Sequence, residues 1–175
     1  NPGLVIGIRS AAFTRFVQTL SALMADQPAQ TMLNAGGLRS YVHGCETLLA
    51  YPQITHLAGQ AQAGNQARAQ LFQADVNLLL TGNELLQEEI FGPATVVVEV
   101  ADRTELLAAL QGLRGQLTAT LIGEPAELEQ SADLVAVLEQ KVGRVLVNGY
   151  PTGVEVCDAM VHGGPWPATS DARGT

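Results

Sequence analysis

The sequence has few cysteines, few positive charges and no long apolar run. Its two cysteines, Cys45 and Cys157, lie far apart without a paired spacing, so we expect reduced thiols and no disulfide framework. The 9 Lys and Arg residues stand singly against 17 Asp and Glu, for a net charge of −8, and form no cluster that would bind nucleic acid. No apolar run approaches the roughly 20 residues of a membrane span. These absences predict a cytoplasmic protein that binds neither nucleic acid nor membrane.

The composition is that of a folded domain, with 47% hydrophobic and only 15% charged residues. A chain of 175 residues is long enough for one compact domain that buries about 70% of its unfolded surface. No signal-like segment is visible, and the opening Asn1-Pro2-Gly3 suggests a piece of a longer chain. His43, His56 and His162 are too scattered for a zinc pattern, so we expect no metal.

The first half predicts a strand and two helices. Leu4–Ile8 is typical of a buried strand. Ser10 can cap a helix whose apolar residues recur at helical spacing and which ends before Pro28. A second helix is expected over residues 35–50, and residues 59–66 are expected to form a surface turn.

The second half predicts three strands that alternate with two helices. Asp102 and Glu105 resemble a capping box, and Glu124-Pro125 opens a helix that is expected to stop at Gly143. This βαβαβ pattern predicts parallel strands with right-handed crossovers, which places function in the loop 148–164 after the last strand. The expected strands cover Thr95–Val100, Leu117–Ile122 and Arg144–Val147.

One short run before the Thr95 strand carries the most information: Glu88-Glu89-Ile90-Phe91-Gly92-Pro93. In the plain interpretation, the run is an acidic turn in which the phenylalanine packs on the core and the Gly-Pro pair marks the turn. The run nevertheless resembles a specific signature of the aldehyde dehydrogenases. In that family the second glutamate binds the nicotinamide ribose hydroxyls and the phenylalanine lies near the nicotinamide. The resemblance implies that Glu89 and Phe91 bind NAD or NADP.

The two ends of the chain also resemble this family. Asn1-Pro2-Gly3 before an apolar strand is similar to the sequence that follows the family's catalytic cysteine, which would then lie two residues before Asn1. The tail from Gly143 to Thr169, with Pro151–Val156 and His162–Thr169, resembles the 2-oxoglutarate semialdehyde (2,5-dioxovalerate) dehydrogenases and a bacterial fatty-aldehyde branch.

The resemblance implies a set of roles around the tail. By position in the loop, the residues that border the aldehyde entrance are Tyr150, Pro151, Thr152 and Gly153. We expect Asn148 and His162 to support the backbone near the site through hydrogen bonds.

The resemblance also implies a fold and an activity. The fold is α/β, three layers with a largely parallel sheet, and residues 1–175 are an incomplete catalytic domain without the upstream cofactor-binding domain. The full-length enzyme is expected to oxidise an aldehyde to a carboxylate with NAD or NADP, and 2-oxoglutarate semialdehyde is the preferred candidate substrate. It is expected to be a homodimer or homotetramer. This chain lacks the nucleophile, so alone it is expected to be inactive.

Other interpretations stay open from the residues. Cys45 with His43, or Cys157 with His162, could form a thiol–imidazole pair, although neither spacing is diagnostic. The substrate could be a fatty aldehyde. The chain could instead be a non-catalytic folded fragment or an interaction domain. A glutamyl-phosphate-type reductase of the same fold would lack the Glu88–Pro93 run.

Overall fold

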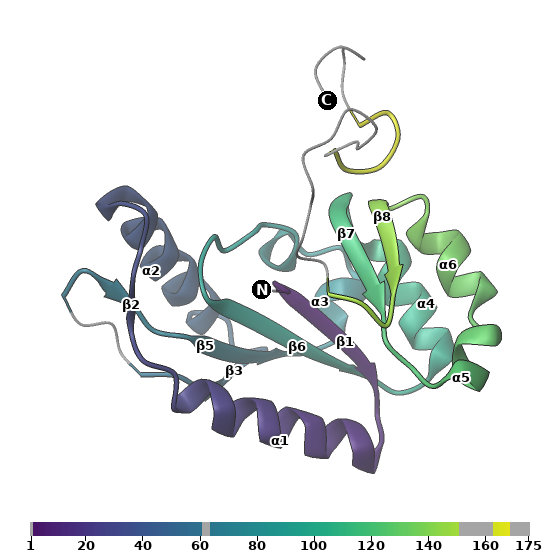
Figure 1. The fold of residues 1–175 in the computed structure, drawn as a ribbon, viewed down its shortest axis with the longest axis horizontal. Helices are drawn as coiled ribbons and strands as arrows, with labels where there is room; N and C mark the ends of the chain where they lie inside the picture. The colour runs from purple at the N-terminus through teal and green to yellow at the C-terminus, as the bar shows by residue number, and fades with distance from the viewer. Residues whose placement is uncertain (1, 61–63, 151–162, 169–175) are drawn as a thin grey trace. The chain divides into compact units, whose positions relative to one another are not determined.

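The computed structural model describes residues 2–60, 64–150 and 163–168. The chain divides into two compact units, residues 1–109 and 110–175 (Figure 1). None of the helices in these described stretches is long and apolar enough to cross a membrane.

The first unit is built on a mixed, mostly parallel sheet. Its four strands run in the order β1-β6-β5-β3, and only the β3–β5 pair is antiparallel. A separate two-stranded antiparallel sheet joins β2 to β4. The strands are β1 (Leu4–Ile8), β2 (Gln30–Thr31), β3 (Ile54–Ala58), β4 (Gln66–Ala67), β5 (Gln70–Ala74) and β6 (Ala94–Val100).

Helices lie on both faces of this sheet, as Figure 1 shows with α1 below it and α2 above it. The apolar side of α1 packs on a core that contains Leu71 of β5 and Val97 of β6, both fully buried. Alternate residues of these central strands face opposite helices, so β6 is buried almost throughout. The helical elements are α1 (Ala11–Ala25), α2 (Ala35–Leu49), α3 (Asn77–Leu80) and the 3₁₀ turn η1 (Glu84–Leu86).

Both long helices begin where a short polar side chain can cap them. The Ser10 hydroxyl accepts the N–H of Phe13 at 3.0 Å, and the Asn34 side chain accepts the N–H of Gly37 at 2.8 Å. The predictions of β1, α2 and β6 are confirmed to within one residue at each boundary, and α1 begins after its predicted cap and ends at Ala25, before Pro28.

The described residues of the second unit contain one pair of parallel strands. β7 (Gln116–Leu121) pairs with β8 (Val142–Val147), and the connection between them carries α5 (Pro125–Glu129) and α6 (Ala132–Leu138). A capping box between Glu124 and Glu127 starts α5. The helix α4 (Arg103–Gly112) spans the division between the units, and the Asp102 carboxylate accepts the N–H of Glu105 at 3.0 Å.

Two predictions about this half were wrong. β6 does not pair with β7, because β1 and β5 already occupy both edges of β6. The expected single helix from Glu124 to Gly143 is two helices. The Ser131 hydroxyl bonds back to the Glu127 carbonyl at 2.8 Å, which ends α5 by competing with the helical pattern. The strands β3 and β5 were not predicted. The α/β class and the largely parallel sheet are confirmed.

Candidate functional site

The Glu88–Pro93 segment leads directly into β6 and rests on the helix α2. The side chain of Ile90 packs against Gly44, where an added Cβ would lie 3.0 Å from Cγ1 of Ile90. Gly92, with φ of 157°, lies flat against the ring of Tyr41, and a Cβ there would be 2.3 Å from Cδ2 of Tyr41. Alternate residues of the segment thus face the helix.

Tyr41 is the buried centre of this contact. Its side chain is 0% exposed, and its hydroxyl donates to the carbonyl of Arg68 at 2.6 Å and lies 3.3 Å from the carbonyl of Pro93. The N–H of Gln70 also donates to the Pro93 carbonyl, at 2.9 Å. Burial raises the pKa of the Tyr41 phenol, so the hydroxyl keeps its proton and remains a donor.

Glu89 and Phe91 face outward, and Glu88 is exposed as well. Both are exposed, and the Phe91 ring is 68% exposed. The plain interpretation, in which this phenylalanine packs on the core, is therefore wrong for the part of the chain that is described. An exposed carboxylate and an exposed apolar ring thus lie two residues apart on this turn. It is an arrangement that suits a ligand with hydroxyl groups and a flat apolar ring.

The other predicted residues lie in the second unit, at the end of β8. Asn148, at φ of 48°, makes two hydrogen bonds to the backbone of Gly123: Oδ1 accepts the N–H at 3.1 Å, and Nδ2 donates to the carbonyl at 3.0 Å. Tyr150 follows and is 87% exposed. The remaining predictions, Pro151, Thr152, Gly153 and His162, lie outside the described residues.

The chain is similar over nearly its whole length to two curated enzymes. It is 52% identical to an α-ketoglutaric semialdehyde dehydrogenase of Acinetobacter baylyi, over 99% of this chain and 34% of that enzyme. It is 43% identical to α-ketoglutaric semialdehyde dehydrogenase 2 of Azospirillum brasilense, over 98% of this chain and 33% of that enzyme. The chain thus spans about a third of the length of these relatives. No family model matches the sequence.

Solved structures decide the fold. The chain superposes on the Δ-pyrroline-5-carboxylate dehydrogenase of Mycobacterium tuberculosis with a TM-score of 0.73 at 16% identity, over 88% of this chain and 30% of that one. It superposes on the succinic semialdehyde dehydrogenase of Streptococcus pyogenes, in complex with NADP⁺, with a TM-score of 0.70 at 16% identity, over 92% and 35% of the two chains. The fold is that of the aldehyde dehydrogenases. The resemblance predicted from the motifs is confirmed.

Within this aldehyde dehydrogenase fold, the alternative pairing of Cys45 with His43 finds no support. Cys45 is buried on α2 beside Tyr41, whereas His43 is exposed. Burial raises the pKa of the Cys45 thiol to about 11, the opposite of what an activated nucleophile needs. Cys157 and His162, the second pair, lie outside the described residues.

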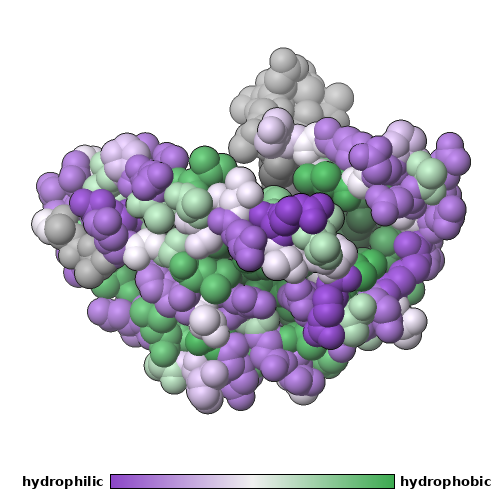
Figure 2. Space-filling view, turned by 90° about the horizontal axis from the view of Figure 1, so that it is seen from below, coloured by the Kyte–Doolittle hydropathy of each residue, from purple (hydrophilic) through white to green (hydrophobic). Residues whose placement is uncertain are grey.

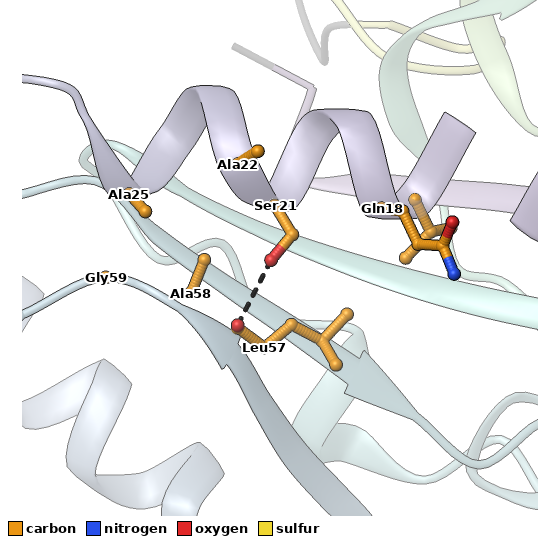
Figure 3. A pocket seen from close by; sticks show the side chains of 8 residues that line it. Gln18, Ser21, Ala22, Ala25, Leu57, Ala58 and Gly59 are labelled. Atoms are coloured by element: carbon orange, nitrogen blue, oxygen red, sulfur yellow. Dashed lines mark hydrogen bonds between the residues drawn. The ribbon is translucent and has the colours of Figure 1, made fainter. Parts of the chain in front are cut away.

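No other described part of the chain offers a better site for chemistry. The described residues contain no group of three or more His, Cys, Asp or Glu side chains that could hold a metal. A shallow groove between α1 and β3 is lined by small and apolar residues and by Gln18, none of them charged. The hydroxyl of Ser21 donates across it to the carbonyl of Leu57 at 3.1 Å (Figure 3). Figure 2 looks onto the α1 side and shows hydrophobic patches interleaved with hydrophilic ones.

The motif predicts Glu89 and Phe91 as cofactor-binding residues, and nothing in the sequence indicates the contacts that hold them. Tyr41 lay within an expected amphipathic helix, where an aromatic residue is ordinary core, and Gly44 carried no signal at all. The contact between residues 41 and 92 is long-range, so a single sequence gives no indication of it.

Proposed function

We propose that this chain is part of an NAD(P)-dependent aldehyde dehydrogenase that oxidises 2-oxoglutarate semialdehyde to 2-oxoglutarate. The observation that carries the proposal is the 52% identity to an α-ketoglutaric semialdehyde dehydrogenase over 99% of this chain. The exposed pair Glu89 and Phe91, on a turn fixed by α2, supplies the physical support.

Glu89 and Phe91 fit the nicotinamide half of the cofactor. The Glu89 carboxylate can accept hydrogen bonds from both hydroxyls of a ribose, and it is free in solvent to do so. The Phe91 ring offers an apolar surface beside it, which would exclude water from one side of a bound ring. When bound, NAD⁺ or NADP⁺ accepts the hydride that the aldehyde carbon loses.

We propose that the nucleophile comes from a part of the enzyme outside this chain. A thiolate must add to the aldehyde carbon, and amide donors must stabilise the oxyanion. Cys45 does not suit that role, since it is buried and its pKa is about 11. The family resemblance places the catalytic cysteine two residues before Asn1, with the general base and most of the dinucleotide-binding domain also upstream.

The substrate side of the chain is the end of β8. We propose that Tyr150, Pro151, Thr152 and Gly153 border the aldehyde entrance and that His162 supports the loop. The hydroxyls of Tyr150 and Thr152 suit a polar aldehyde. No arginine occurs within residues 150–169, so a clamp for the substrate carboxylate would come from elsewhere in the enzyme.

The remaining proposals concern the assembly. Both units belong to a single catalytic domain over residues 1–175, and the whole enzyme is a cytoplasmic homodimer or homotetramer. The fold likeness to aldehyde dehydrogenases over most of the chain, across both units, supports the first of these.

The substrate is tested with the full-length enzyme that contains this chain. We expect kcat/KM for 2-oxoglutarate semialdehyde to exceed the value for a long-chain alkyl aldehyde by at least tenfold, with glutarate semialdehyde between them. The isolated chain, assayed in parallel, should show no turnover with either cofactor.

The controls separate the parts of this proposal. A clear advantage for the long-chain aldehyde would replace the semialdehyde with a fatty aldehyde and leave the dehydrogenase assignment standing. Turnover by the isolated chain that is lost on Cys157→Ser would show instead that the nucleophile lies within it.

A further inference from the structure

The buried face of α2 makes contacts that the proposed function does not use. We infer that Tyr41 is a positioning residue for the cofactor: its ring against Gly92 and its hydroxyl at the carbonyls of Arg68 and Pro93 hold Glu89 and Phe91 in their outward orientation. This inference rests on the proposed function, because it assigns to Tyr41 an effect on the cofactor that Glu89 and Phe91 would bind.

The first support is the alternation of the segment. Ile90 and Gly92 face α2, so Glu89 and Phe91, one residue to either side of Ile90, face away from it. Gly92 approaches the Tyr41 ring so closely that no side chain fits between them. A side chain at position 92 would meet the ring, so the close fit of Gly92 fixes the distance between the segment and α2. The surface of Tyr41 that receives Gly92 therefore determines which side chains reach a ligand.

The second support is the hydroxyl. Pro93 has no N–H, so its carbonyl is the group through which the backbone can be held at that residue. The Tyr41 hydroxyl lies 3.3 Å from this carbonyl and donates at 2.6 Å to that of Arg68. Arg68 precedes β5 and Pro93 precedes β6, and these strands are hydrogen-bonded neighbours. The buried Tyr41 phenol thus connects the residues that precede two adjacent strands, at the point where the exposed segment ends.

The test compares three variants of the full-length enzyme. Tyr41→Phe keeps the ring and removes the hydroxyl, whereas Tyr41→Leu removes both. Leu48→Val is the matched control, since Leu48 is buried two turns further along α2 and is placed in no part of the binding machinery. For each variant we would measure the thermal unfolding midpoint, the Kd for NAD⁺ and NADP⁺, the single-turnover rate of hydride transfer and the KM for the aldehyde.

We expect Tyr41→Phe to slow hydride transfer or weaken cofactor binding by about tenfold, which is the effect of one lost hydrogen bond. Tyr41→Leu should lose more, and the aldehyde KM should change by less than twofold in both. Leu48→Val should keep wild-type cofactor kinetics even where its unfolding midpoint falls as far as that of Tyr41→Phe.

Two results would overturn the inference. One is a loss of cofactor kinetics in Leu48→Val equal to that in Tyr41→Phe at equal stability, which would make Tyr41 ordinary core. The other is wild-type cofactor kinetics in both Tyr41 variants. A failure of the proposed function would give a different result from a failure of this inference, because the unmodified enzyme would then oxidise no aldehyde with either cofactor. In that case the inference would fail as well.

Discussion

Two turns in this chain hold exposed residues in place by different means. The Glu88–Pro93 turn is fixed by buried packing, with Gly92 on the Tyr41 ring and Ile90 on Gly44. The turn at Asn148–Tyr150 is fixed by two hydrogen bonds from the Asn148 side chain to the backbone of Gly123, and these groups are exposed.

The two turns differ in what can replace these contacts when a side chain is removed. Water can satisfy the donor and acceptor of an exposed hydrogen bond when its partner is removed, so the net cost is small. Nothing replaces a lost or overfilled contact inside a packed core. We therefore expect the first turn to be the more rigid and the less tolerant of substitution.

The largest effect should follow from Gly92→Ala. The new Cβ would meet the Tyr41 ring at 2.3 Å, and the φ of 157° is unfavourable for a side chain. We expect a loss of about 2–4 kcal/mol in the free energy of unfolding, measured by urea titration. Gly64→Ala is the control, since Gly64 also has a positive φ, of 65°, but nothing lies within 4 Å of its Cβ position.

The control should lose only about 1–2 kcal/mol, the cost of the backbone conformation alone. Equal losses in the two variants would show that the Tyr41 ring does not confine Gly92, and the contrast between the turns would disappear.

A smaller effect is expected at the second turn. Asn148→Gly keeps the backbone free to adopt its φ of 48° and removes only the two bonds to Gly123, so it should cost about 1 kcal/mol or less. Asn148→Ala should cost about 1 kcal/mol more, because alanine disfavours that conformation. A loss in Asn148→Gly as large as that in Gly92→Ala would contradict the distinction between exposed and buried supports.

The last effect, which is absent near neutral pH, is a pH dependence that arises beside Tyr41. The pKa of Cys45 is about 11 in the folded chain, above the value of about 8.5 for a free thiol. The folded state therefore keeps a proton that the unfolded state releases, so the stabilisation is complete below about pH 8.5 and is lost as the pH rises to about 11. Wild type should lose stability over that window relative to Cys45→Ala.

Alkylation provides an independent check of this burial. Iodoacetamide at pH 8, followed by mass spectrometry of the peptide that contains Cys45, should show far slower modification in the native chain than in urea. Equal rates would show that the α2 face is open.

Much of this fold follows from local pattern, and the exceptions have physical causes. Ser10 and the apolar spacing after it specify α1, and the β-branched run of β6 specifies a central strand. By contrast, β5 reads Gln-Leu-Phe-Gln-Ala and is buried on both faces, so it shows no alternation that would distinguish a strand. The partners of β6 depend on strand pairing between distant segments, which a βαβαβ pattern cannot specify.

The candidate site also combines features that follow from local sequence with features that depend on contacts between distant segments. A six-residue motif predicts cofactor-binding roles for Glu89 and Phe91, because the family resemblance attaches to consecutive residues. Their support from Tyr41 and Gly44 arises only when α2 packs against the segment. At the end of β8, Asn148 was expected to hold backbone, and it bonds to Gly123, a partner 25 residues away that the sequence did not indicate.

The central claim is that the exposed Glu88–Pro93 turn binds the cofactor, and Glu89→Gln in the full-length enzyme tests it most directly. The substitution preserves size and removes the charge from a side chain exposed to solvent, so the unfolding midpoint should not change. We predict that the hydride-transfer rate, or the affinity for NAD⁺ or NADP⁺, falls about ten- to a hundredfold, as expected for about 1.5–3 kcal/mol from a charged hydrogen bond. An unchanged rate together with unchanged cofactor affinity would contradict the account.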